Sequence, residues 1–160
     1  MGDASIILSA VATFATAISA VMAVMAFCKS VKTQKKISEN TKKQMTIEAF
    51  NYLQEQVLDK FVSFSKSDVS IILDNMEHED VKEAYNDCRA MIAKCEHFAV
   101  GVNTEIYDFE TVERLGGMHL VYLYDKLKPI ILETRKSTKG GEVYYKEFEM
   151  LANNLAEKLA

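Results

Sequence analysis

The sequence is poor in residues that interrupt helices or cross-link small folds. Its 160 residues include one proline, six glycines and three cysteines. So few turn-forming residues argue against a many-stranded β fold and favour helices. A small, odd number of cysteines excludes a disulfide scaffold. With 49% apolar and 26% charged residues, the composition predicts a folded all-α chain rather than a disordered one.

The common motifs of enzymes and metal sites are also missing. The sequence has no glycine-rich phosphate loop, no Cys-x-x-Cys and no His-Glu-x-x-His. Cys88 and Cys95 would lie about 10 Å apart along one helix, too far for a disulfide, so we expect them to pack in the core. His97 has no neighbour at a metal-ligand spacing. We therefore expect no enzyme activity, no metal site and no cofactor.

One long apolar run lies at the N-terminus. Residues 4–28 carry no charge, and as a helix they would extend roughly 37 Å, enough to cross a hydrocarbon core of about 30 Å. Asp3 precedes the run and six lysines follow it within residues 29–43. The positive-inside rule then predicts a single-pass helix in the inner (cytoplasmic) membrane, with the N-terminus outside and the C-terminal domain cytoplasmic. A buried helix of a globular protein is the alternative.

The predicted span has a polar face. Five hydroxyl side chains fall within about a third of the helix circumference, together with small alanines. Small residues let helices approach closely, and hydroxyls either hydrogen-bond between helices or face water. Three interpretations stay open: packed helices without a pore, a ring of four or more helices around a pore, and an inert tether. The predicted pore-lining residues are Ser5, Ser9, Thr13, Thr16, Ser19 and Ala20.

A basic juxtamembrane stalk, residues 29–46, precedes a small cytoplasmic helical domain at residues 47–160. The lysines of the stalk are placed to meet anionic lipid head groups. In the domain, apolar residues recur every three or four positions, which is typical of helices in a bundle. The first stripe is Phe50, Leu53, Val57, Phe61 and Phe64; the second is Val81, Tyr85, Cys88, Met91, Ile92, Cys95, Phe98, Ala99 and Val102; the third is Tyr145, Phe148, Leu151, Ala152 and Leu155.

Three single residues predict local features of this bundle. Asp108 is expected to cap a short helix that ends at Gly116-Gly117, and Pro129 to kink or divide the next helix. Glu96 stands in the second apolar stripe, where a carboxylate needs a partner. We predict a structural ion pair between Glu96 and Arg135 across the bundle, in preference to a catalytic role.

A basic segment flanked by tyrosines is the candidate ligand site. Cations beside aromatic rings hold phosphates and stack the bases of a nucleotide or a short single strand. The alternative is a solvated helix end, because cations complement the dipole at a helix C-terminus. The acidic balance of the domain argues against duplex DNA as a partner. The predicted ligand-binding residues are Lys126, Lys128, Arg135, Lys136, Lys139 and Tyr144.

Some of these residues carry a family resemblance. The relevant features are the run CEHFAVGV at Cys95–Val102, the spacing of Tyr124, Pro129-Ile130 and Arg135, and the later Tyr145 and Phe148-Glu149. They are similar to the core motifs of a bacterial and phage family of membrane-anchored helical proteins. The resemblance covers residues 1–155 and implies one N-terminal spanning helix, a polar stalk and a helical domain, but no particular activity.

The layout also resembles small membrane effectors of antiphage systems such as Hailong. That resemblance implies a channel held shut by a cytoplasmic domain with a bound oligonucleotide. The first functional hypothesis is therefore a homo-oligomeric membrane effector whose ion-conducting pore is gated by a domain sensing an anionic nucleotide or oligonucleotide. The second is a non-conducting membrane-anchored scaffold that recruits a cytoplasmic protein partner.

Overall fold

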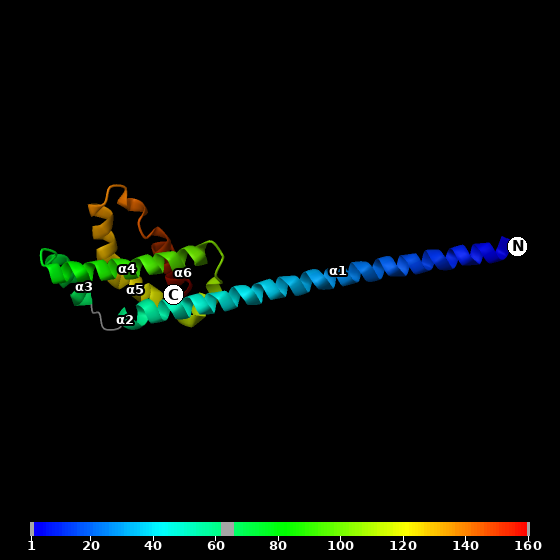
Figure 1. The fold of residues 1–160 in the computed structure, drawn as a ribbon, viewed down its shortest axis with the longest axis horizontal. Helices are drawn as coiled ribbons and strands as arrows, with labels where there is room; N and C mark the ends of the chain where they lie inside the picture. Colours follow the sequence, from blue (N-terminus) through cyan, green and yellow to red (C-terminus); the bar gives the residue numbers. More distant parts are fainter. Residues whose placement is uncertain (1, 62–65, 160) are drawn as a thin grey trace. The chain divides into compact units, whose positions relative to one another are not determined.

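The computed structural model describes the backbone of residues 2–61 and 66–159, and the side chains of residues 25–61 and 68–159. The described chain is all-α and contains no strand, which confirms the predicted fold class at this level. The elements, in order, are α1 (Gly2–Leu53), the π-helical turn η1 (Gln54–Leu58), α2 (Asp59–Phe61), α3 (Lys66–Asp74), α4 (Glu79–Asn103), α5 (Phe109–Ser137), the 3-10 turn η2 (Gly141–Val143) and α6 (Lys146–Leu159) (Figure 1).

The chain divides into two compact units, one ending at Thr41 and the other beginning at Lys42. In the first unit the described side chains, from residue 25 onward, are all exposed. The hydroxyl of Thr41 donates a hydrogen bond to the carbonyl oxygen of Ile37, one turn earlier, at 2.9 Å. The boundary between the units falls inside the stalk predicted at residues 29–46.

The second unit is a helical bundle around one hydrophobic core. α4, α5 and α6 pack against one another, and α3 packs on α4 and α5 (Figure 1). The last turns of α1 join this core through Phe50, whose ring meets that of Phe98 edge-on at a centroid distance of 6.0 Å. The predicted stripes are buried apart from half-buried Val81, which confirms their helical spacing, and Phe64 lies outside the described residues. The largest fully buried side chains include Phe50, Ile92, Leu120, Leu123, Leu127, Ile130, Ile131, Phe148, Leu151 and Leu155.

The start of α5 is capped as the sequence predicts. Asp108 accepts hydrogen bonds from the backbone N–H of Thr111 at 2.9 Å and from its hydroxyl at 2.6 Å. The backbone N–H of Asp108 donates to the fully buried hydroxyl of Thr46 at 2.7 Å, and that hydroxyl donates to the carbonyl oxygen of Lys42 at 2.8 Å. One buried threonine therefore ties this part of α1 to the cap of α5.

α5 is kinked at Gly116. The backbone of Gly116 is non-helical (φ 170°, ψ 37°), close to where the sequence predicts a helix end. A side chain would not fit there, because a Cβ would lie 2.8 Å from the ring of Phe50. The helix then continues through Pro129, so the predicted division of the helix at that proline is wrong. Pro129 and Asp125 are both exposed, and the Asp125 carbonyl that loses its helical partner can bond to water.

The loop between α5 and α6 folds back over the end of α5. Gly141 packs so closely on the carbonyl of Arg135 that a Cβ at this position would clash with it. Tyr145, the last residue before α6, has a left-handed backbone (φ 59°) and a buried ring. Burial of the ring keeps the backbone of Tyr145 in a conformation that L-residues rarely adopt. This turn brings the first residues of α6 against α4.

Candidate functional site

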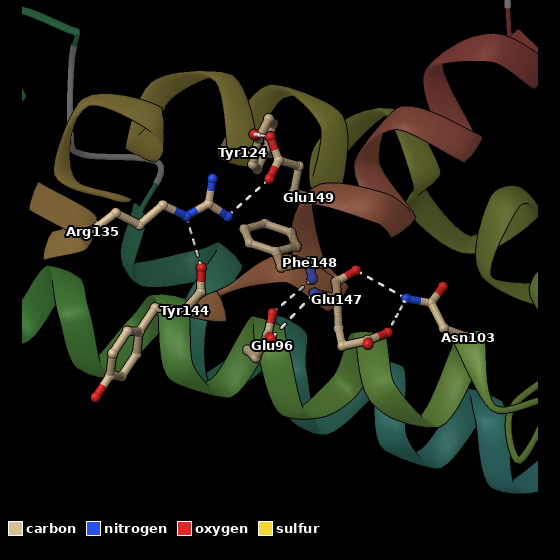
Figure 2. A network of polar contacts seen from close by, with 8 residues as sticks. All are labelled: Glu96, Asn103, Tyr124, Arg135, Tyr144, Glu147, Phe148 and Glu149. Carbon is tan, nitrogen blue, oxygen red and sulfur yellow. Dashed lines mark hydrogen bonds and ion pairs between the residues drawn. The ribbon is translucent and has the colours of Figure 1, made fainter. Parts of the chain in front are cut away.

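The basic end of α5 is joined to α6 by an ion pair. Arg135 donates from Nη2 to Oε2 of Glu149 at 2.8 Å, and from Nε to the carbonyl oxygen of Tyr144 at 2.9 Å. Tyr124 donates its hydroxyl to Oε1 of Glu149 at 2.9 Å. Figure 2 shows the Glu149 carboxylate between the guanidinium and phenol groups. Both of its oxygens therefore already accept hydrogen bonds from the protein's own donors.

These contacts set the protonation states of Glu149 and Tyr124. Partial burial opposes the ionised form of Glu149, but the hydrogen bonds from Arg135 and Tyr124 outweigh burial and lower the pKa of this carboxyl group. Burial, together with the hydrogen bond to Glu149, raises the pKa of Tyr124 well above its ordinary value. Neither group titrates near neutral pH. The trio is therefore suited to holding two helices together and not to proton transfer.

A carboxylate from α4 caps the start of α6. Glu96 accepts a hydrogen bond from the backbone N–H of Glu147 at 3.2 Å and another from that of Phe148 at 2.7 Å (Figure 2). N–H groups in the first turn of a helix have no acceptor within the helix, and the dipole there favours a negative charge. Asn103 donates to the carbonyl and side-chain oxygens of Glu147, at 3.0 and 2.8 Å. α4 thus holds the N-terminus of α6 at two points.

The predicted ion pair between Glu96 and Arg135 is wrong. The guanidinium pairs with Glu149, while Glu96 bonds to backbone amides (Figure 2). The physical reason is that the start of α6 offers Glu96 two N–H donors, and α6 supplies its own carboxylate to Arg135. Glu149 was not among the predicted residues, although it follows the loop that leads back from Arg135. The available signal was its position one helical turn after Tyr145, which places its carboxylate near the start of the last helix.

Two of the predicted ligand-binding lysines lie against aromatic rings. Lys126 is buried, with Nζ 4.3 Å from the ring centroid of Tyr122 and 5.3 Å from that of Phe61. Lys128 places Nζ 5.9 Å from the ring centroid of Tyr124. Lys126 lines a hollow of about 380 Å³ that none of the other five predicted residues lines. Cation–π contacts within the protein therefore account for both lysines.

The remaining predicted residues lie at the end of α5 and in the loop after it. Lys136 and Lys139 are exposed. The ring of Tyr144 is 40% exposed and contacts Tyr145 at a centroid distance of 6.0 Å. The structure thus brings Tyr144 and Arg135 together and leaves the two lysines at the surface. An anion can reach these lysines directly, but it must displace Glu149 to take over the Nη2 group of Arg135.

A family comparison covers nearly all of this arrangement. The model of a family described as Domain of unknown function (DUF4760) matches residues 10–155. The chain belongs to the DUF4760 family. The matched DUF4760 region includes both Arg135 and Glu149, as well as Glu96 on α4. No curated protein matches the chain, and no solved structure matches it either.

The predicted pore-lining face of this DUF4760 chain lies outside the described side chains, which begin at residue 25. At these positions the structure describes only the backbone of α1. In the part of the chain that was described, no helix is both long and apolar enough to cross a membrane. The residues concerned are Ser5, Ser9, Thr13, Thr16, Ser19 and Ala20.

The two cysteines of α4 pack in the core, as their spacing predicts. Cys88 and Cys95 are buried, and burial raises the pKa of Cys88 to about 11 and that of Cys95 to about 12. Their thiols are therefore protonated near neutral pH and poorly nucleophilic. Among the described residues of this DUF4760 domain, no group of three or more His, Cys, Asp or Glu side chains is placed to hold a metal ion.

The sequence did not predict the groove that this domain carries between α1 and α4. A hollow of about 660 Å³ opens there, and buried Leu53 and Phe98 are among its lining residues. The exposed side chains of Met45 and Tyr52 stand on its α1 edge. These two apolar residues are seven positions apart on one helix, which was the available signal for a second apolar face.

Proposed function

We propose that this chain is a homo-oligomeric membrane effector that forms an ion-conducting pore. Residues 4–28 cross the inner (cytoplasmic) membrane once, with the N-terminus outside and the helical domain in the cytoplasm. Four or more copies assemble so that the polar faces of their spanning helices surround a shared axis. Antiphage defence is the proposed setting, in line with the resemblance to Hailong-type effectors.

The uncharged run and its polar face carry this proposal. Residues 4–28 hold no charge, and six lysines follow on the side proposed to be cytoplasmic. A plain anchor needs no particular pattern around its circumference, whereas a helix that lines a pore needs a face able to contact water. Thr13 and Thr16 belong to that face and stand near the middle of residues 4–28 in the sequence, and their hydroxyls are the groups on which the proposal depends.

The contacts at the end of α5 support a gating role for the domain. Exposed Lys136 and Lys139 offer first contacts to an anionic nucleotide or single-stranded oligonucleotide. Such a ligand would compete with Glu149 for Arg135. Because Tyr124 donates to the other oxygen of the same carboxylate, a movement of the Glu149 side chain away from Arg135 would weaken both contacts that hold α6 to α5. Ligand binding is thereby coupled to the packing of α6.

Single-channel recording of the purified full-length chain in a lipid bilayer tests the pore. The wild type should form a discrete oligomer of four or more copies and conduct ions. Thr13→Leu/Thr16→Leu should abolish conductance without changing the oligomer mass, while the control Val11→Leu/Ile18→Leu on the opposite face should conduct normally. A Thr13→Leu/Thr16→Leu channel with wild-type conductance contradicts the pore.

A short single-stranded oligonucleotide, added to the cytoplasmic side, should change the open probability of the channel. An unchanged open probability rejects this ligand class.

A non-conducting membrane-anchored scaffold is the second candidate. It is favoured by the internal contacts of the basic cluster, since Lys126 and Lys128 lie against rings and Arg135 pairs with Glu149. Those contacts leave fewer groups for a ligand than the sequence suggests. The scaffold predicts that an unrelated spanning helix can replace residues 4–28 with function in cells retained, whereas the pore predicts that function is lost.

A further inference from the structure

The groove between α1 and α4 is an apolar hollow of about 660 Å³ for which the contacts described above provide no occupant. Leu53 and Phe98, both buried, form its base, and Tyr107 lies at one end. A second hollow of about 250 Å³ shares the lining residues Gln56 and Lys94 and is lined by residues of η1, α2 and α4. Together the two hollows follow α4 from residue 87 to residue 98, roughly 17 Å of helix. That length matches about three turns of a docked helix.

The edges of the groove combine protruding and small side chains on one surface. On the α1 edge, Met45 is 45% exposed and Tyr52 is 62% exposed. On the α4 edge the exposed residues are the small Ala93 and the larger Lys94 and His97. A surface whose two edges differ in this way can meet a copy of itself with unlike edges facing each other. That property is the requirement for a two-fold interface, in which the same patch is used by both subunits.

The charges on the two edges are also self-complementary. Glu48, on the α1 edge, accepts a hydrogen bond from the Gln44 amide at 3.1 Å. Lys94, on the α4 edge, donates to the Gln56 amide at 3.5 Å. Within the described residues neither side chain forms an ion pair. Because Lys94 lies beside Gln56, eight residues along the chain from Glu48, a two-fold axis set obliquely across the groove would bring Glu48 of each copy toward Lys94 of the other. One approach would then create two ion pairs.

We propose that a second copy of this chain docks in the groove, with the α1 edge of each copy against the α4 edge of the other. Tyr52 supplies the apolar anchor, because a large ring with a polar tip suits a contact that is partly wet. Glu48 and Lys94 fix the register. The inference rests on the proposed function, since it supplies a contact that joins the domains of the homo-oligomer in pairs.

A charge exchange between two full-length variants tests this surface. Glu48→Lys leaves one positive charge on each edge, and Lys94→Glu leaves one negative charge on each edge. Each variant alone should self-associate about tenfold more weakly than wild type in detergent, measured by energy transfer between donor- and acceptor-labelled copies. An equimolar mixture of the two variants should restore association, because every edge then meets an opposite charge. Glu83→Lys and Lys82→Glu, on an exposed part of α4, are the matched controls and should associate normally.

A labelling measurement reports on the groove even if the spanning helices hold the copies together. In a Cys28→Ser background, Ala93→Cys should react slowly with a maleimide when a second copy covers the groove. Adding Glu48→Lys should raise that rate, and the mixture with Lys94→Glu should lower it again. Rates that stay equal across all these samples overturn the inference.

The outcomes separate this inference from the proposed function. If the wild type conducts as an oligomer but the charge exchange has no effect, the groove is not the contact and the pore stands. If the wild type is monomeric, both are overturned. Native mass spectrometry of the Ala93→Cys chain tests for another occupant. If a single copy retains a small molecule or a different polypeptide, and the introduced thiol still reacts slowly with the maleimide, the second copy is the wrong occupant.

Discussion

The start of α6 and the groove between α1 and α4 differ in how their charged groups are satisfied. At the start of α6, Glu96 accepts two backbone N–H groups and Glu149 accepts two side-chain donors. At the groove, Glu48 and Lys94 bond only to neutral amides, and Tyr52 is largely exposed. An added ligand must break existing bonds at the first region but forms new ones at the second. A cluster of cations in the sequence is therefore a weaker indicator of binding than unmatched groups on a folded surface.

The largest effect on stability should come from removing the cap of α6. Glu96→Ala leaves two backbone N–H groups without their acceptor and should lower the free energy of unfolding by about 2 kcal/mol. Glu96→Gln keeps one carbonyl acceptor and should lose roughly half as much. Urea unfolding of the full-length chain, followed by circular dichroism, measures both. Glu83→Ala, an exposed position on the same helix, should change the value by less than about 0.5 kcal/mol. Equal losses for Glu96→Ala and Glu83→Ala would show that the cap contributes nothing.

A smaller effect should follow from breaking the ion pair between α5 and α6. The side chains of Arg135 and Glu149 are 17% and 33% exposed, whereas those of Arg114 and Glu110, an ion pair one turn apart on α5, are 76% and 55% exposed. Arg135→Met should cost about 1 to 1.5 kcal/mol of unfolding free energy, because it also frees the Tyr144 carbonyl. Arg114→Met should cost less than about 0.5 kcal/mol. The same urea titration measures both variants. Similar losses would show that the Arg135–Glu149 pair contributes no more to stability than an exposed surface ion pair.

The helices were predictable because their signals are local. Apolar spacing located the buried faces of α4 and α6, and the Asp108 cap followed from a short polar residue ahead of a helix. Pro129 does not divide α5 as predicted, because on an exposed face the carbonyl that it frees can bond to water and the helix continues. Whether such a residue ends a helix depends on tertiary surroundings, which spacing does not encode.

The candidate site was predictable only in its composition. Glu96 was expected to need a partner and does bond within the protein, but whether Arg135 pairs with Glu96 or Glu149 depends on the path of the loop. A left-handed residue at Tyr145 and a close contact at Gly141 set that path. Neither feature has a sequence signal strong enough to fix it. The groove was missed for a related reason, because it exists only where two helices from distant parts of the chain meet.

The smallest effect should appear as a dependence of stability on pH. The pKa of Glu149 is lowered in the folded chain, against partial burial, by its bonds to Arg135 and Tyr124. Its contribution is therefore complete above the ordinary glutamate pKa of 4.5 and is lost as the pH falls through the lower, folded value. Near pH 7 the free energy of unfolding of wild type should exceed that of Glu149→Gln by less than about 1 kcal/mol.

That difference should narrow as the pH falls below about 4. The pKa of Asp108 is also lowered, chiefly by its hydrogen bond from the Thr111 side chain, so protonation of Asp108 lowers the free energy of unfolding in the same pH range. This loss occurs in both proteins and cancels when the unfolding free energy of Glu149→Gln is subtracted from that of wild type. Paired urea titrations at several pH values measure the difference. A gap that stays constant down to pH 3 would mean that ionisation of Glu149 adds nothing to the contact, so the hydrogen bonds that Arg135 and Tyr124 donate to this side chain would hold α6 equally well without its charge.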